Sequence, residues 1–177
     1  MNIELWGVTI MKIRNAEVKD AQNFLNMLKK LDTETKNMMF EPGERNAKLE
    51  KIEARIKNTS GENGLLLLID DNNKIGGFLS AERGWCKRIR HVAYIVVGML
   101  TEYRGKHLGT NMFKELEKWA ISNNIIRLEL SVVCTNESAL ALYKKMGFKI
   151  EGTKEKAMIV DGNYVDEYYM GKIINKN

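Results

Sequence analysis

Hydrophobic and polar residues follow one another along this chain in spacings that predict a regular succession of strands and helices. The stretch 92–100 is almost continuously apolar and predicts a buried strand. A short polar turn with Gly105 and Gly109 follows it, and apolar residues then recur at helical spacing over 106–122. We therefore expect a strand, a glycine-bearing turn and a helix in direct succession at the centre of the fold.

Before this unit, the pattern predicts a strand, two helices and two further strands. The two helices are separated by Glu41-Pro-Gly-Glu44, because proline with glycine favours a turn. In chain order we expect a strand over 11–15, helices over about 18–31 and 44–58, and strands over 65–69 and 74–81. The basic stretch 83–90 is expected to form the hairpin that leads into 92–100.

After the central unit, the pattern predicts a strand over 125–133, a helix over 136–146 that ends at Gly147, and a closing hairpin over 157–174. There is no internal repeat or linker. We expect one α+β domain over 11–177, in which a mixed, mostly antiparallel sheet of about seven strands forms the middle of three layers with helices on both faces. Residues 1–10 are expected to be an N-terminal extension or the start of the first strand.

The composition of the 177 residues agrees with a globular domain, since 44% are hydrophobic and 29% are charged. No apolar run approaches the roughly 18 residues of a membrane-spanning helix, and no basic segment precedes the first apolar residues as it would in a signal peptide. Cys86 and Cys134 form no CxxC pair, which favours free thiols in a reducing cytoplasm. His91 and His107 lack suitably spaced partner ligands, so no metal site is expected.

The turn over 104–110 offers a binding site for a phosphate. The first N–H groups of a helix have no intrahelical acceptor, and the helix dipole adds partial positive charge there. The net charge of +5 also suits a polyanionic ligand. Neither the nucleoside-triphosphate loop GxxxxGK(S/T) nor the dinucleotide pattern GxGxxG is present. From these residues alone we predict a phosphorylated ligand held by backbone amides.

Two segments resemble the signatures of the GNAT N-acetyltransferase family. The sequence Arg104-Gly-Lys-His-Leu-Gly109 resembles the element that binds the pyrophosphate of acetyl-CoA, with His107 where the family has its first glycine. One strand later, the segment 136–148 resembles the second signature, with Asn136, Ala139, Tyr143 and Gly147-Phe148 in family spacing. The surrounding elements match in order, so that the resemblance runs from about residue 11 to the end of the chain.

This resemblance implies the GNAT acyl-CoA transferase fold, in which two central strands splay apart and the thioester lies between them. It implies acetyl-CoA as co-substrate and no metal. The implied cofactor-binding residues are Met99, Leu100, Thr101, Arg104, Gly105, Lys106, His107, Leu108, Gly109, Thr110, Asn136 and Tyr143. Asn136 also has a plain structural role as the N-cap of its helix, and the two roles are compatible.

Tyr143 is the implied catalytic residue. Its phenol would donate a proton to the departing thiolate, although its helical position also suits a buried core tyrosine. A neutral amine would attack the acetyl carbonyl directly, while backbone N–H groups stabilise the oxyanion. The general base is open, and the candidates are Glu41, Glu82, Glu102, Glu129 and His91, with Glu129 weakly favoured and a water relay as the alternative.

We therefore expect an acetyl-CoA-dependent N-acetyltransferase that acts on a primary amine of a small molecule or of a protein N-terminus. The end of the chain resembles the branch of the ribosomal-protein N-terminal acetyltransferases, and family members are often homodimers. One alternative is a noncatalytic acyl-CoA-binding or sensing module, which the presence of Tyr143 disfavours. A nucleic-acid-binding domain is the other, suggested by the basic stretch 83–90 with Trp85, but a solvated, positively charged strand edge explains that stretch better.

Overall fold

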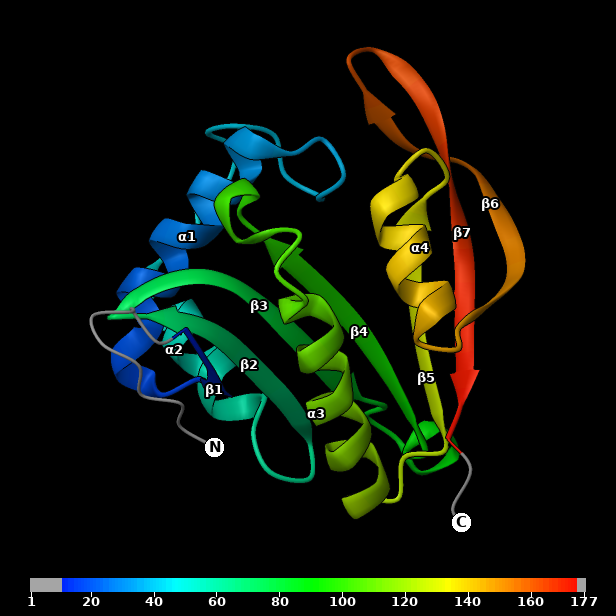
Figure 1. Cartoon of the computed structure of the whole chain (residues 1–177), viewed down its shortest axis with the longest axis horizontal. Helices are drawn as coiled ribbons and strands as arrows, with labels where there is room; N and C mark the ends of the chain where they lie inside the picture. Colours follow the sequence, from blue (N-terminus) through cyan, green and yellow to red (C-terminus); the bar gives the residue numbers. More distant parts are fainter. Residues whose placement is uncertain (1–10, 175–177) are drawn as a thin grey trace.

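The structure, a computed structural model, describes residues 11–174 and consists of one seven-stranded sheet with helices on both faces (Figure 1). The spatial order of the strands is β1-β2-β3-β4-β5-β7-β6. Their bounds are β1 Lys12–Asn15, β2 Gly64–Asp71, β3 Lys74–Arg83, β4 Val92–Met99, β5 Arg127–Val133, β6 Lys149–Val160 and β7 Asn163–Ile173. All neighbouring pairs are antiparallel except β4 and β5. The predicted fold class is thus confirmed, and the prediction for residues 1–10 lies outside the described residues.

Four α-helices cover the sheet, two on each face (Figure 1). They are α1 Ala21–Glu34 and α2 Leu49–Asn58 on one face, and α3 Leu108–Ser122 and α4 Glu137–Lys145 on the other. Short 3-10 turns occupy Val18–Asp20, Lys87–Ile89 and Thr101–Tyr103. Within residues 11–174, no helix combines the length and apolar character that crossing a membrane requires.

Two predicted boundaries were wrong, and one predicted connection was confirmed. The second helix begins at Leu49 rather than at 44, and the chain before it is non-helical. The basic stretch 83–90 does form the predicted hairpin connection into β4, because β3 and β4 are antiparallel neighbours, and a 3-10 turn at Lys87–Ile89 lies within it. Strand β6 begins eight residues earlier than expected, at Lys149. It is an exposed strand at the edge of the sheet, so its first residues show no apolar alternation from which a strand could be predicted.

The arrangement of β4 and β5 determines where a ligand can enter the sheet. They are parallel neighbours joined through α3, and they pair over only three positions, from Val92 with Arg127 to Tyr94 with Glu129. Beyond these positions β4 stays paired with β3, and β5 stays paired with β7. The second halves of the two central strands therefore diverge within an otherwise continuous sheet.

Candidate active site

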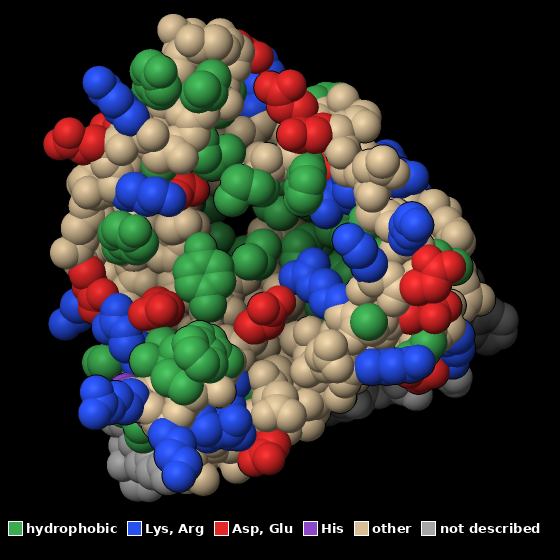
Figure 2. Space-filling view, turned by 180° about the vertical axis from the view of Figure 1, so that it is seen from behind, with side chains coloured by type: hydrophobic (Ala, Val, Ile, Leu, Met, Phe, Trp, Pro, Cys, Tyr) green, Lys and Arg blue, Asp and Glu red, His purple; other side chains and the backbone are tan. Residues whose placement is uncertain are grey.

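A cavity of about 620 Å³ lies where β4 and β5 diverge. It is lined by the second half of β4, the end of β5, the turn before α3, one side of α4 and the loop after α1. Seen from behind in Figure 2, the surface is hollowed at this place, between hydrophobic side chains. Most of the implied cofactor-binding residues line this cavity, namely Met99, Arg104, Gly105, His107, Leu108, Gly109, Thr110, Asn136 and Tyr143.

The N-terminus of α3 forms one wall of the cavity and is open to an anion. Leu108, Gly109 and Thr110 are its first three residues, whose N–H groups have no intrahelical acceptor. No side chain caps this end of the helix. A phosphate placed there would accept from these N–H groups and lie at the positive end of the helix dipole.

His107 is the N-cap residue of α3 and adopts a left-handed backbone conformation, with φ of 58°. Only glycine takes this conformation freely, because the Cβ of other residues crowds the carbonyl oxygen. Gly105, two residues earlier, has φ of 74° and needs the same freedom. The turn therefore contains a glycine at one left-handed position and a histidine at the other, the one where the implied family pattern has glycine.

We expect His107→Gly to raise the free energy of unfolding by about 1 kcal/mol, because it removes the left-handed strain of a residue with a Cβ. Gly105→Ala is the matched reverse change and should lower it by a similar amount, about 1 kcal/mol. Urea unfolding of both variants measures these effects. A His107→Gly protein less stable than the wild type would show that the imidazole makes a compensating contact.

Helix α4 closes the cavity from the same face of the sheet. Asn136 is its N-cap, and its side-chain oxygen accepts a hydrogen bond from the Ala139 N–H at 3.3 Å. The predicted capping role is thus confirmed, and Asn136 also lines the cavity. Gly109 lets α3 and α4 approach closely, since a Cβ there would lie 2.9 Å from a methyl group of Leu142.

Tyr143 is held by aromatic packing in the wall of the cavity. Its ring makes an edge contact with Phe113 of α3, with centroids 5.7 Å apart, and a tilted contact with Phe148 at 6.1 Å. The residue is 6% exposed. Burial raises the pKa of the Tyr143 phenol well above its ordinary value. The hydroxyl therefore stays protonated at neutral pH, as a proton donor must.

Three of the implied cofactor residues do not line the cavity. Leu100 is buried, and its N–H donates to the Gly76 carbonyl at 3.0 Å. The Thr101 N–H donates to Glu34 Oε2 at 2.7 Å, and this bond is the main reason why the pKa of the Glu34 carboxyl lies below its ordinary value. Lys106 Nζ lies 5.6 Å from the centre of the Tyr103 ring. The N–H groups of Leu100 and Thr101 are therefore already engaged in hydrogen bonds within the protein.

None of the five candidate bases lines the cavity. Glu129 pairs with Arg127 at 2.9 Å, and Glu102 lies 3.1 Å from both Lys30 and Lys74. Among the described residues, the cavity does contain one carboxylate, that of Glu167 on β7, which we did not predict. One signal in the sequence could have identified Glu167. It alternates with Val165 and Tyr169 along a predicted strand, at a position where an apolar residue is expected.

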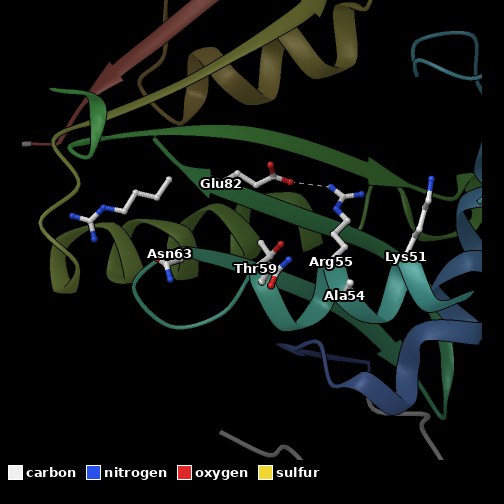
Figure 3. Close-up of a pocket in the computed structure, with 8 residues that line it drawn as sticks. Lys51, Ala54, Arg55, Thr59, Asn63 and Glu82 are labelled. Carbon is white, nitrogen blue, oxygen red and sulfur yellow. Dashed lines mark ion pairs between the residues drawn. The ribbon is translucent and has the colours of Figure 1, made fainter. Parts of the chain in front are cut away.

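A second hollow, of about 490 Å³, lies between α2 and the end of β3 (Figure 3). Glu82, another candidate base, is found here, with Oε1 3.6 Å from Arg55 Nη2. Arg55 also donates to Ser80 Oγ at 3.2 Å, whereas Lys51 points away from the pair (Figure 3). No implied cofactor residue lines this hollow, so it is separate from the cavity between β4 and β5.

Comparisons with known proteins agree with this geometry. The family model described as Acetyltransferase (GNAT) family matches residues 25–148. The L-amino acid N-acetyltransferase AaaT of Escherichia coli is 29% identical over 123 residues, which cover 67% of this chain and 73% of that protein. A GNAT-family acetyltransferase from Streptococcus pneumoniae superimposes with a TM-score of 0.88 at 32% identity, over 94% of this chain and 100% of that one.

A more distant structure shares only the fold. It is yncA from Salmonella typhimurium, solved with its cofactor acetyl-CoA, with a TM-score of 0.83 at 16% identity over 95% of this chain and 96% of that one. The matched family model covers both signature segments, the turn before α3 and the helix α4. This chain belongs to the GNAT family of acetyltransferases.

Proposed function

We propose that this enzyme transfers the acetyl group of acetyl-CoA to a primary amine by direct attack in the cavity between β4 and β5. The observation that carries the proposal is the composition of this one cavity. It joins an uncapped helix N-terminus, suited to a pyrophosphate, to a buried and protonated tyrosine. The acetyl-CoA bound to the Salmonella structure and the N-acetyltransferase activity in the name of the Escherichia coli relative support the same assignment.

We assign the pyrophosphate to the turn before α3 and to its first residues, whose N–H groups have no intrahelical acceptor. Arg104 lies beside them, but its Nε already donates to the Met99 carbonyl at 3.0 Å, so its remaining guanidinium N–H groups would be the donors to phosphate. Asn136 contributes from the N-terminus of α4. Because the N–H groups of Leu100 and Thr101 are engaged, we assign no cofactor bond to them.

In the proposed reaction, the amine nitrogen forms a bond to the acetyl carbon while the carbon–sulfur bond of the thioester breaks. The departing thiolate takes the proton of Tyr143, and the tyrosinate takes back a proton that the attacking nitrogen loses. The products are an N-acetyl amine and the free thiol of coenzyme A. The cavity positions the two reactants, which by itself lowers the barrier by removing the need for a chance encounter.

Thiol release from acetyl-CoA tests the proposal, with a panel of amines that includes free N-terminal peptides, polyamines and aminoglycosides. We expect release with at least one amine class. We also expect acetyl-CoA at a hundredfold excess over its Kd to stabilise the protein by about 2.7 kcal/mol. Acetyl-CoA protection without any thiol release would favour a sensing module, and salt-dependent protection by DNA or RNA instead would favour nucleic-acid binding.

A further inference from the structure

The cavity contains a single acidic side chain, and the proposed function leaves it without a role. Among the described residues that line the cavity, only Glu167 carries a carboxylate. It lies opposite Val133 of β5 and Lys154 of β6 in the sheet. Its side chain is 11% exposed, and the one ion-pair contact that it makes within residues 11–174 is long, with Lys154 Nζ 3.7 Å from Oε2. A carboxylate that is this buried and this loosely paired is costly unless it has a further partner.

The position of Glu167 in the sheet separates it from the cofactor side. Glu167 pairs with Val133 of β5, and two positions further along the strands Tyr169 pairs with Ser131. Because alternate residues of a strand share a face, Glu167, Tyr169 and Ser131 lie on the same face of the sheet. The Ser131 hydroxyl lies 3.0 Å from that of Tyr94, which also lines the cavity. Since the proposed function assigns the turn before α3 to the pyrophosphate and Tyr143 to the thiolate, Glu167 and Tyr94 remain as cavity groups for the acceptor. The other titratable side chains that line the cavity are Arg104, His107, Tyr143 and Lys145.

The rim on the acceptor side is rich in methionine, with the polar Thr35 and Asn37 beside it. Met38 and Met39 of the loop after α1 and Met158 of β6 all line the cavity. Lys36 holds this loop to the β6–β7 turn through Asp161, with Nζ 2.5 Å from Oδ2. Methionine side chains adapt to apolar groups of different shapes. An acceptor at this place would meet one carboxylate and three flexible methionine side chains, with a few uncharged polar groups among them.

We propose that Glu167 binds the ammonium group of the acceptor and takes its proton, and that the acceptor is a primary amine next to an apolar side chain. This inference rests on the proposed function, because it uses the same cavity. Glu167 would accept one proton from the ammonium and later pass it to water. The neutral amine left beside it attacks the acetyl carbon, and Tyr143 protonates the thiolate as the carbon–sulfur bond breaks. The proton that the nitrogen then loses returns to the tyrosinate.

The variant Glu167→Gln tests this role, with Glu155→Gln on the exposed side of β6 as the matched control. The probe is 2-phenylethylamine. At pH 7, Glu167→Gln should lower kcat/KM for the amine by about a hundredfold, within the range for loss of a general base, with the Kd of acetyl-CoA changed less than twofold. Glu155→Gln should behave like the wild type. A loss below threefold in Glu167→Gln would overturn the proposal.

The pH profile gives a readout that a merely structural role would not change. With Glu167 in place, the ammonium form is the reactive one, so kcat/KM should stay flat from about pH 6 to 9 and fall above the amine pKa near 10. Without the base, only the free amine reacts, and kcat/KM should rise about tenfold per pH unit over this range. A flat profile in Glu167→Gln would contradict the assignment.

Equilibrium binding separates this inference from the proposed function. In the complex with coenzyme A, the wild type should bind 2-phenylethylamine at least tenfold more tightly than 2-phenylethanol, and Glu167→Gln should bind the two equally. Amine binding without thiol release would reject the acetyl transfer but keep the role of Glu167 in recognition. Equal affinity for the two probes in the wild type would reject that role. A kcat/KM for ethanolamine equal to that for 2-phenylethylamine would reject the apolar acceptor.

Discussion

Replacing Tyr143 with phenylalanine is expected to lower kcat by about a hundredfold or more, because loss of a general acid costs two to four orders of magnitude. The change removes only the hydroxyl. The ring contacts with Phe113 and Phe148 stay in place, so the cavity wall should keep its shape. We therefore expect the Kd of acetyl-CoA and the melting temperature to stay close to those of the wild type. Steady-state thiol release and calorimetric titration with acetyl-CoA measure these quantities.

Tyr169→Phe is the matched control, because Tyr169 lies on β7, is 50% exposed and does not line the cavity. It should retain full turnover. Since burial holds the pKa of the Tyr143 phenol above its ordinary value, the proton to be donated is present throughout the neutral range. No loss of wild-type kcat through ionisation of Tyr143 should therefore occur below about pH 10. Full turnover in Tyr143→Phe would remove the proposed acid from the mechanism.

The substitution Arg45→Met is expected to lower the free energy of unfolding by about 3 kcal/mol. Arg45 donates two hydrogen bonds to Asp32 of α1, at 2.6 and 2.8 Å, and the Asp32 side chain is fully buried. Its guanidinium also stacks on Phe40, 4.3 Å from the ring centre. Removing one partner of a buried pair leaves an uncompensated charge, which costs about 3–5 kcal/mol. Urea unfolding provides the measurement.

Two further variants show whether the buried charge is the cause. Lys36→Met removes the exposed ion pair with Asp161 from the same loop and should cost less than about 1 kcal/mol. The double variant Asp32→Leu with Arg45→Met removes both charges and should recover most of the lost stability. If Arg45→Met costs no more than Lys36→Met, the buried pair does not determine how the loop is held. Because Met38 and Met39 belong to this loop, we also expect Arg45→Met to raise KM for the amine.

Features that depend on neighbouring residues could be predicted from the sequence. The strand over 92–100, the glycine-bearing turn and the following helix are local patterns of periodicity and turn chemistry, and all three form nearly as expected. Asn136 was predicted as an N-cap because its role involves only the N–H three residues later. The same local signatures were sufficient to indicate the family.

Features that depend on distant pairing could not be predicted. Strand β6 is exposed and polar, and only its pairing with β7 defines where it begins. Leu100 and Thr101 were implied as cofactor contacts, but Gly76 and Glu34, from other parts of the chain, already accept hydrogen bonds from their N–H groups. Glu129 was only weakly favoured as a base, and the structure pairs it with Arg127 outside the cavity.

The sequence by itself determined the order of the elements, the glycine-bearing turn before α3 and the tyrosine of α4, because each follows from residues a few positions apart. Only the tertiary structure decided that β4 and β5 pair over three positions and then diverge, which opens the cavity. It also decided that the carboxylate in this cavity is that of Glu167. The physical reason is that side chains which meet across the sheet determine strand register and burial. The spacing of residues along one strand does not show which side chains will meet.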